Sequence, residues 1–107
     1  MRVLSTSDRF RQIAWELVKK HGPKKKPQFV ISNGPPEQFH SIGWPNGIVI
    51  SVDRKRMMRF DFDRGLGSRL AGKRGGCLAE ASIPIMTAGG RKLICDLLEK
   101  VKAYTDK

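Results

Sequence analysis

The stretch GLGSRLAGKRGG, residues 65–76, contains the spacing of a nucleotide-binding phosphate loop. Gly67 to Lys73 fits G-x-x-x-x-G-K, in which backbone N–H groups and the lysine hold phosphates. That chemistry also requires a Ser or Thr after the lysine to hold Mg²⁺, a helix that starts there, and a buried parallel strand before the loop. Here Arg74 follows the lysine, Gly75 and Gly76 come next, and residues 57–63 (MMRFDFD) alternate like an antiparallel strand. The sequence therefore argues against nucleotide hydrolysis.

The same loop combines glycine with positive charge, which suggests a second chemistry. Arg64 precedes the loop, and Arg69, Lys73 and Arg74 lie within it. Backbone amides and basic side chains of this kind can close on phosphates when a nucleic acid arrives. A Gly-rich segment is also typical of a solvated connection. Both interpretations remain open for this loop.

The formal charge of +11 points to a polyanionic partner. There are 21 Lys and Arg against 10 Asp and Glu, and nucleic acid is the commonest polyanion that a small basic protein meets. The positive charges are clustered, with 13 of the 21 in residues 19–26 and 54–74. The candidate phosphate-binding residues are Lys24, Lys25, Lys26, Arg54, Lys55, Arg56, Arg69, Lys73 and Arg74.

Arg54, Lys55 and Arg56 occupy the tip of a predicted hairpin. A two-stranded ribbon fits the major groove of DNA, so this tip is suited to reach a groove or a phosphate backbone. Charge at a hairpin tip can equally serve edge protection and solubility. Whether the basic segments converge on one face cannot be deduced from sequence.

Residues that could catalyse a reaction are few. His40 with Glu37 could act as an acid/base pair in a toxin-like ribonuclease, helped by Arg residues that stabilise phosphorane-like charge. We expect His21, at a predicted helix end, to interact favourably with the helix dipole rather than to take part in catalysis. Cys77 and Cys95 match no metal-ligand spacing and lie in apolar runs, so we expect reduced, inert thiols and neither metal nor cofactor.

The aromatic residues Trp15, Phe39 and Trp44 could stack on unpaired bases. With only 7% aromatic residues, a small core needs most of them, so we expect them to pack inside.

Hydrophobic periodicity predicts two helices that flank a set of strands. A helix with Ser7 as N-cap and an apolar stripe from Phe10 to Val18 ends at Gly22 and Pro23. A final helix, capped by Thr87 and starting near Arg91 after two glycines, carries the stripe Leu93 to Tyr104. The predicted strands are residues 28–32, 39–44, 48–52, 57–63 and 77–86, with Pro84 favouring a sheet edge or a strand end.

We therefore expect a single α+β domain over residues 1–107, with both helices on one face of a mostly antiparallel sheet of four to five strands. We expect residues 23–27 to form a basic linker and residues 64–76 to form a flexible Gly-rich loop. The sequence has no signal peptide and no apolar run long enough to span a bilayer, so we expect a cytoplasmic protein without a membrane partner.

The function expected from sequence is nucleic-acid binding, DNA or RNA, mainly through phosphate contacts. An accessory or regulatory role in a mobile element or virus fits the size and charge. The alternatives are the toxin-like ribonuclease and a non-enzymatic protein that docks on an acidic partner, which could be a homodimer through the sheet edge near Pro84.

Overall fold

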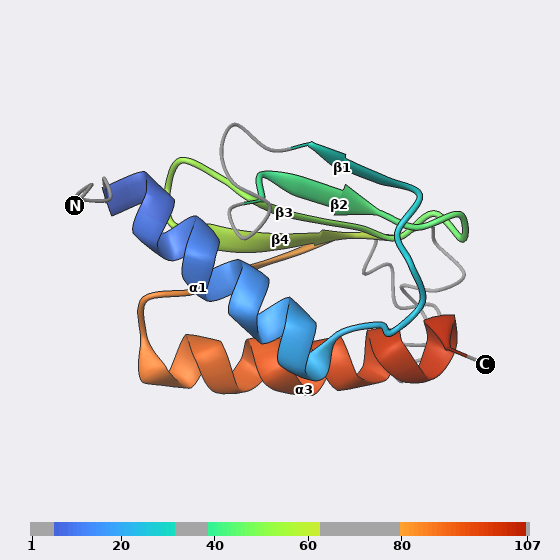
Figure 1. Cartoon of the computed structure of the whole chain (residues 1–107). Coiled ribbons are helices and arrows are strands. Elements are labelled where there is room, and N and C mark those ends of the chain that lie inside the picture. The colour runs from blue at the N-terminus through green and yellow to red at the C-terminus, as the bar shows by residue number, and fades with distance from the viewer. Residues whose placement is uncertain (1–5, 32–38, 63–79, 107) are drawn as a thin grey trace.

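The computed structural model describes residues 6–31, 39–62 and 80–106. Within these ranges the chain forms two helices and five strands, in the order α1, β1 to β5, α3 (Figure 1). Their bounds are α1 Thr6–His21, β1 Phe29–Ile31, β2 Ser41–Gly43, β3 Val49–Val52, β4 Met57–Asp61, β5 Glu80–Pro84 and α3 Ala88–Thr105. Each of these elements matches one predicted from hydrophobic periodicity.

The first helix buries the stripe that its sequence predicts. Phe10, Ala14 and Val18 are buried and recur every four residues. The helix ends where expected, because the N–H of Gly22 donates to the carbonyl of Val18 at 2.8 Å and Pro23 follows. The predicted N-cap at Ser7 is wrong, since α1 already begins at Thr6. Asp8 stands in the first turn, where a negative charge suits the helix dipole.

The five strands pair in chain order, and every neighbouring pair is antiparallel. β3 and β4 alternate half-buried and buried residues, as their sequences predict. Ile50 lies opposite Phe60, and Val52 lies opposite Met58, so one face of this hairpin is apolar. The sheet is therefore a simple meander with a single core-facing side.

The final helix starts earlier than its sequence suggests. Thr87 is the N-cap, as predicted, and its hydroxyl accepts a hydrogen bond from the N–H of Gly90 at 3.0 Å. The start near Arg91 is wrong, because α3 begins at Ala88 and includes both glycines. A Cβ atom on Gly90 would overlap the carbonyl oxygen of Pro84. Glycine is thus required here by the close approach of helix to strand, which outweighs its low helix propensity.

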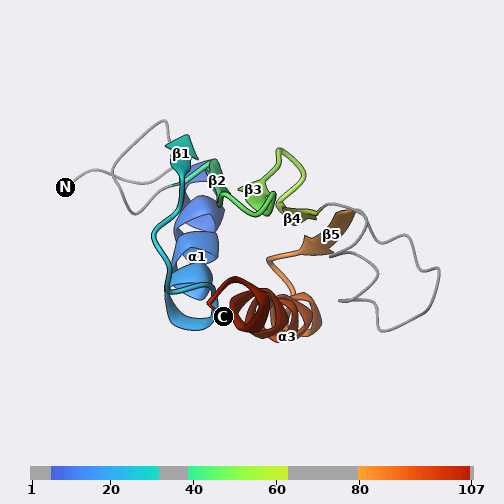
Figure 2. The same cartoon turned by 90° about the vertical axis from the view of Figure 1, so that its right-hand side faces the viewer.

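Both helices lie on the same face of the sheet, α1 below β1 and β2 and α3 nearer β5 (Figure 2). The core lies between the helices and the sheet and contains residues of both layers. These include Phe39, Ile50, Phe60, Ile94 and Leu98, each at zero exposure. This arrangement confirms the predicted α+β fold. Among the described strands β1 and β5 are the outermost, so the edge position predicted from Pro84 is also confirmed.

Candidate nucleic-acid interface

The basic linker is held in place by residues from distant parts of the chain. The backbone N–H groups of Lys24 and Lys25 donate to the two carboxylate oxygens of Asp106, at 2.7 and 3.1 Å. In addition, the indole N–H of Trp44 donates to the carbonyl of Lys25 at 3.0 Å. The side chains of Lys24, Lys25 and Lys26 are exposed. The linker therefore carries three exposed lysine side chains on a fixed backbone.

The carboxylate of Asp106 meets this linker through two hydrogen bonds, and both use backbone donors. The N–H of Lys24, with that of Lys25 and the charges of Lys102 and Lys25, lowers the pKa of Asp106 below its ordinary value. The carboxylate stays ionised and accepts from the backbone. We call Lys24–Lys26 together with Trp44 and Asp106 the lysine end.

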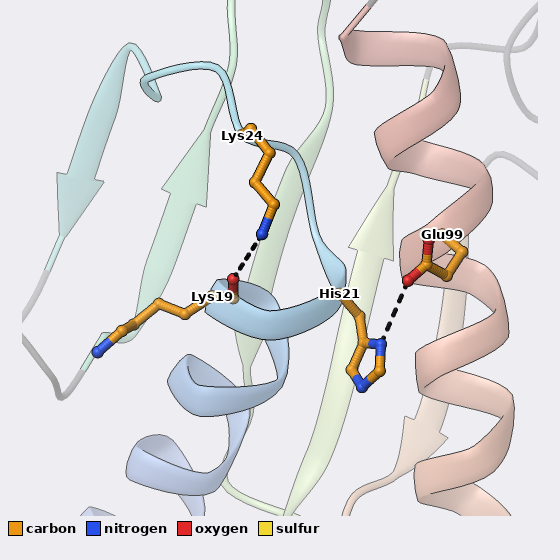
Figure 3. Close-up of polar contacts among 4 residues, drawn as sticks. All are labelled: Lys19, His21, Lys24 and Glu99. Atoms are coloured by element: carbon orange, nitrogen blue, oxygen red, sulfur yellow. Dashed lines mark hydrogen bonds and ion pairs between the residues drawn. The ribbon is translucent and has the colours of Figure 1, made fainter.

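The end of α1 adds to this charge and ties the two helices together (Figure 3). The ammonium group of Lys24 donates to the backbone carbonyl of Lys19 at 3.1 Å, where the helix dipole is negative. Nδ1 of His21 lies 3.3 Å from Oε1 of Glu99 on α3. His21 thus sits at the helix end, as expected, and its contact is with α3.

The hairpin tip, Arg54–Arg56, is held by its own neighbour. Oδ1 of Asp53 accepts hydrogen bonds from the N–H groups of Lys55 at 2.8 Å and Met57 at 3.1 Å. Arg56 adopts a positive φ of 62°, in the left-handed region that turns use. All three basic side chains of the tip are exposed. The tip is therefore an ordered turn that carries its cations outward.

The lysine end and the hairpin tip lie at opposite ends of the sheet (Figure 1). The linker joins the sheet where Gly43 pairs with Val49, through the N–H of Gln28 and the carbonyl of Gly43. The tip follows Val52, at the opposite end of β3 from Val49, so the linker and the tip extend from opposite ends of the sheet. Within one chain, these two predicted clusters do not form one continuous patch.

Arg69, Lys73 and Arg74 lie outside the described residues, as do Glu37 and Cys77. Asp61 and Glu80 pair across β4 and β5 at the same end of the sheet as Gly43 and Val49. The strands that flank residues 63–79 therefore end and begin at the lysine end. The proposed role of the Gly-rich loop stays a prediction.

A third group of cations was not expected from the sequence. An open groove of about 670 Å³ lies between α1 and the start of α3, and Ile13 and Leu17 line it together with Arg9, Lys20 and Arg91. Gln12 and Glu16 complete its lining. The spacing of these α1 residues by three and four could have suggested one helix face. The approach of Arg91 depends on the tertiary packing and has no local signal.

The candidate catalytic residue His40 is half-buried. Its backbone N–H donates to Ile31 at 2.9 Å and its carbonyl accepts from Val52 at 3.0 Å, so it bridges β1 and β3. Its Nδ1 atom is buried without a hydrogen-bond partner in the described part of the chain. The ribonuclease hypothesis, which also requires Glu37, stays a prediction.

Cys95 is half-buried, and its environment favours the neutral thiol. Burial, followed by the negative charges of Asp96 and Glu99, raises the pKa of Cys95, while Lys20 acts in the opposite sense. A thiol in this state is a poor nucleophile at neutral pH. Across residues 6–31, 39–62 and 80–106, no cluster of His, Cys, Asp and Glu could hold a metal ion.

The three aromatic residues considered for base stacking pack inside the molecule. Phe39 is fully buried and Trp44 is 4% exposed. The rings of Trp15 and Phe39 lie 5.5 Å apart at a tilted angle, which joins α1 to the sheet. The preference for core packing is confirmed.

Comparison of the chain with protein-family models, with curated proteins and with solved structures finds no significant match. In the described ranges, neither helix is long and apolar enough to cross a membrane.

Proposed function

We propose that this protein binds nucleic acid, mainly through phosphates, and that the lysine end is its principal contact. The observation that carries the proposal is the fixed backbone of the linker. Hydrogen bonds with Asp106 and Trp44 hold the main chain while Lys24, Lys25 and Lys26 remain exposed. Cations presented from an ordered segment lose less conformational entropy when they meet phosphates.

The surrounding residues support the same proposal. Lys19 and Lys20 are exposed on the last turn of α1, next to the linker. The carboxylate of Asp106 accepts backbone N–H groups, which places this acid at the main chain of the linker. The hairpin tip is a second contact in this proposal. Because it lies at the other end of the sheet, a single chain would meet nucleic acid at two separate points.

A salt series with labelled single-stranded DNA, duplex DNA and RNA tests the proposal. We expect affinity to fall steeply with salt, since each neutralised phosphate contributes about 0.9 to the slope of log K against log salt for duplex DNA. Substituting Lys25 and Lys26 with alanine should reduce that slope by up to two contacts. Alanine keeps the backbone N–H of Lys25, so the linker remains attached to Asp106.

The matched control removes two charges elsewhere. Lys92→Ala with Lys100→Ala changes two exposed lysines of α3 by the same net charge. If binding depends on the lysine end, K25A/K26A loses more affinity than K92A/K100A. Equal losses would mean that total charge alone matters. Absence of binding to all three probes below about 10⁻⁴ M at physiological salt contradicts the proposal.

The groove between α1 and α3 favours a second candidate, docking of an acidic amphipathic helix from a partner protein. Ile13 and Leu17 provide an apolar strip four residues apart, and the lining carries three positive charges, from Arg9, Lys20 and Arg91, against the one negative charge of Glu16. A designed helical peptide with two leucines four residues apart and flanking glutamates is a suitable probe. Arg9→Glu with Arg91→Glu should abolish its binding, and unchanged binding would exclude this groove.

A further inference from the structure

Strand β1 is an unusually apolar sheet edge. Phe29, Val30 and Ile31 are 41%, 46% and 53% exposed, although the side chains alternate between the two faces of the sheet. Figure 2 shows β1 at one extreme of the sheet, and among the described strands β1 pairs with β2 alone. Natural sheets normally protect such an edge with charge, proline or a covering segment, because its free backbone groups pair readily with another strand.

The opposite edge differs. β5 ends in Pro84, which lacks a backbone N–H, and Ile83 is only half-buried against the core. The exposed residues Ser82 and Pro84 present no apolar strip comparable with β1. Of the two edges, β1 is therefore the better candidate for pairing, whereas sequence alone had suggested the edge near Pro84.

The sequence of β1 is complementary to itself. An antiparallel pair related by a two-fold axis at Val30 places Val30 opposite Val30 of a second copy. Phe29 of each copy then lies opposite Ile31 of the other, so every cross-strand pair is apolar and no charge is buried. The ring of Phe29 already covers Gly43 on its own sheet, where a Cβ atom would overlap the ring, which fixes the aromatic side chain for such a contact.

We infer that the occupant of this edge is a second copy of the chain, and that two copies pair through β1 into one continuous antiparallel sheet. The symmetry has a consequence for the basic clusters, and this part rests on the proposed function. Antiparallel pairing reverses the second copy, so its hairpin tip lies at the same end of the joint sheet as the first copy's lysine end. The lateral separation is roughly 15 to 20 Å at the spacing of strands.

Two clusters that are apart within one chain thus form a composite basic flank between two chains. Each dimer has two such flanks, each built from Lys24–Lys26 of one copy and the tip residues 54–56 of the other. The two lysine ends remain at opposite ends of the joint sheet, which limits their repulsion. Because each copy carries +11, pairing should strengthen with salt, whereas nucleic-acid binding should weaken.

Sedimentation without nucleic acid tests the pairing. The wild-type mass should rise from one chain to two with concentration, and more readily at higher salt. Val30→Glu and Val30→Lys should each remain monomeric, because like charges then oppose each other across the axis. An equimolar mixture of the two should recover the dimer through a Glu–Lys pair. Leu93→Glu, on α3 at 59% exposure, is the matched control and should dimerise like the wild type.

A wild-type chain that stays monomeric at all salt and protein concentrations overturns the inference, as does a dimer that V30E leaves intact. Both Val30 variants should have the circular dichroism spectrum and melting behaviour of the wild type. A loss of the dimer is then not caused by misfolding. A dimer that V30E disrupts but the mixture does not restore contradicts the register centred on Val30. Binding of an extended apolar peptide by a monomer would assign the edge to another occupant.

Subunit mixing tests the composite flank. One variant carries K24A, K25A and K26A, and the other carries R54A, K55A and R56G, with glycine chosen for the positive φ at position 56. A mixed dimer has one flank with both clusters intact and one with neither. The mixture should therefore bind duplex DNA more tightly than either variant alone, and V30E in both chains should remove the gain.

The two parts of the inference fail separately. If the mixture binds duplex DNA with the mean affinity of the two variants while the dimer stays intact, the composite flank is wrong. The pairing through β1 then still stands. If no form binds nucleic acid, the proposed function and the flank both fail, while the sedimentation result still decides the dimer.

Discussion

The lysine end and the hairpin tip both expose three consecutive basic residues, but different kinds of contact hold them. The tip is fixed by Asp53, which accepts hydrogen bonds from residues two and four positions later. The lysine end is fixed by Asp106, more than eighty positions away in sequence, and by Trp44 from the sheet. Similar charge can thus be ordered either by local turn chemistry or by the tertiary fold, and only the first depends on neighbouring residues alone.

The largest expected effect is loss of the tertiary support at the lysine end. Trp44→Ala removes a buried ring and the hydrogen bond to the carbonyl of Lys25. We expect a loss of about 3 to 5 kcal/mol in the free energy of unfolding, measured in urea. Trp15→Ala, which truncates a half-buried ring packed on Phe39, should cost less. Equal losses would show that Trp44 has no special position in the fold.

Loss of the hydrogen bonds that hold the hairpin tip should reduce the free energy of unfolding less than the loss of Trp44 does. Asp53→Ala leaves the N–H groups of Lys55 and Met57 without their acceptor, and the exposed N–H of Lys55 can bond to water instead. We expect a loss of about 1 kcal/mol in the same unfolding measurement. A loss as large as that of Trp44→Ala would mean that the turn, like the lysine end, supports the core.

The smallest expected effect concerns pH at the lysine end. The pKa of Asp106 is lowered in the folded chain, so its ionised form contributes stability above the ordinary Asp pKa of about 3.9. That contribution is lost as pH falls below this value towards the folded pKa. Melting temperatures of the wild type and Asp106→Asn should therefore differ most near neutral pH and converge on acidification. A difference that is constant with pH contradicts the role of the carboxylate charge.

Much of the fold could be predicted because its signals are local. Alternation in residues 57–61 predicts β4 and its buried face, and the stripe from Phe10 to Val18 predicts α1. The start of α3 could not be predicted, because the need for glycine at position 90 comes from the carbonyl of Pro84 across the packed layers. Local propensity argues for a later start, and tertiary packing overrides it.

The sequence predicts which residues make up the candidate site, but it does not predict how these residues are arranged in space. The basic character of Lys24–Lys26 is evident from three consecutive lysines, but the attachment of that segment to Asp106 and Trp44 has no sequence signal. Likewise, the strand order alone decides that the hairpin tip faces away from the lysine end. The groove beside Arg91 depends on how α1 and α3 cross, which neither helix encodes by itself.

The contact between Lys24 and Asp106 also bears on the order in which the chain acquires its surface. It closes a segment of 82 positions, and long loops close late because their ends must first find each other at an entropic cost. The hairpin that carries Arg54–Arg56 closes over a few residues and can form early. A folding intermediate would then display the tip in its final shape while the three lysines still move freely, so the fixed lysine arrangement marks the fully folded chain.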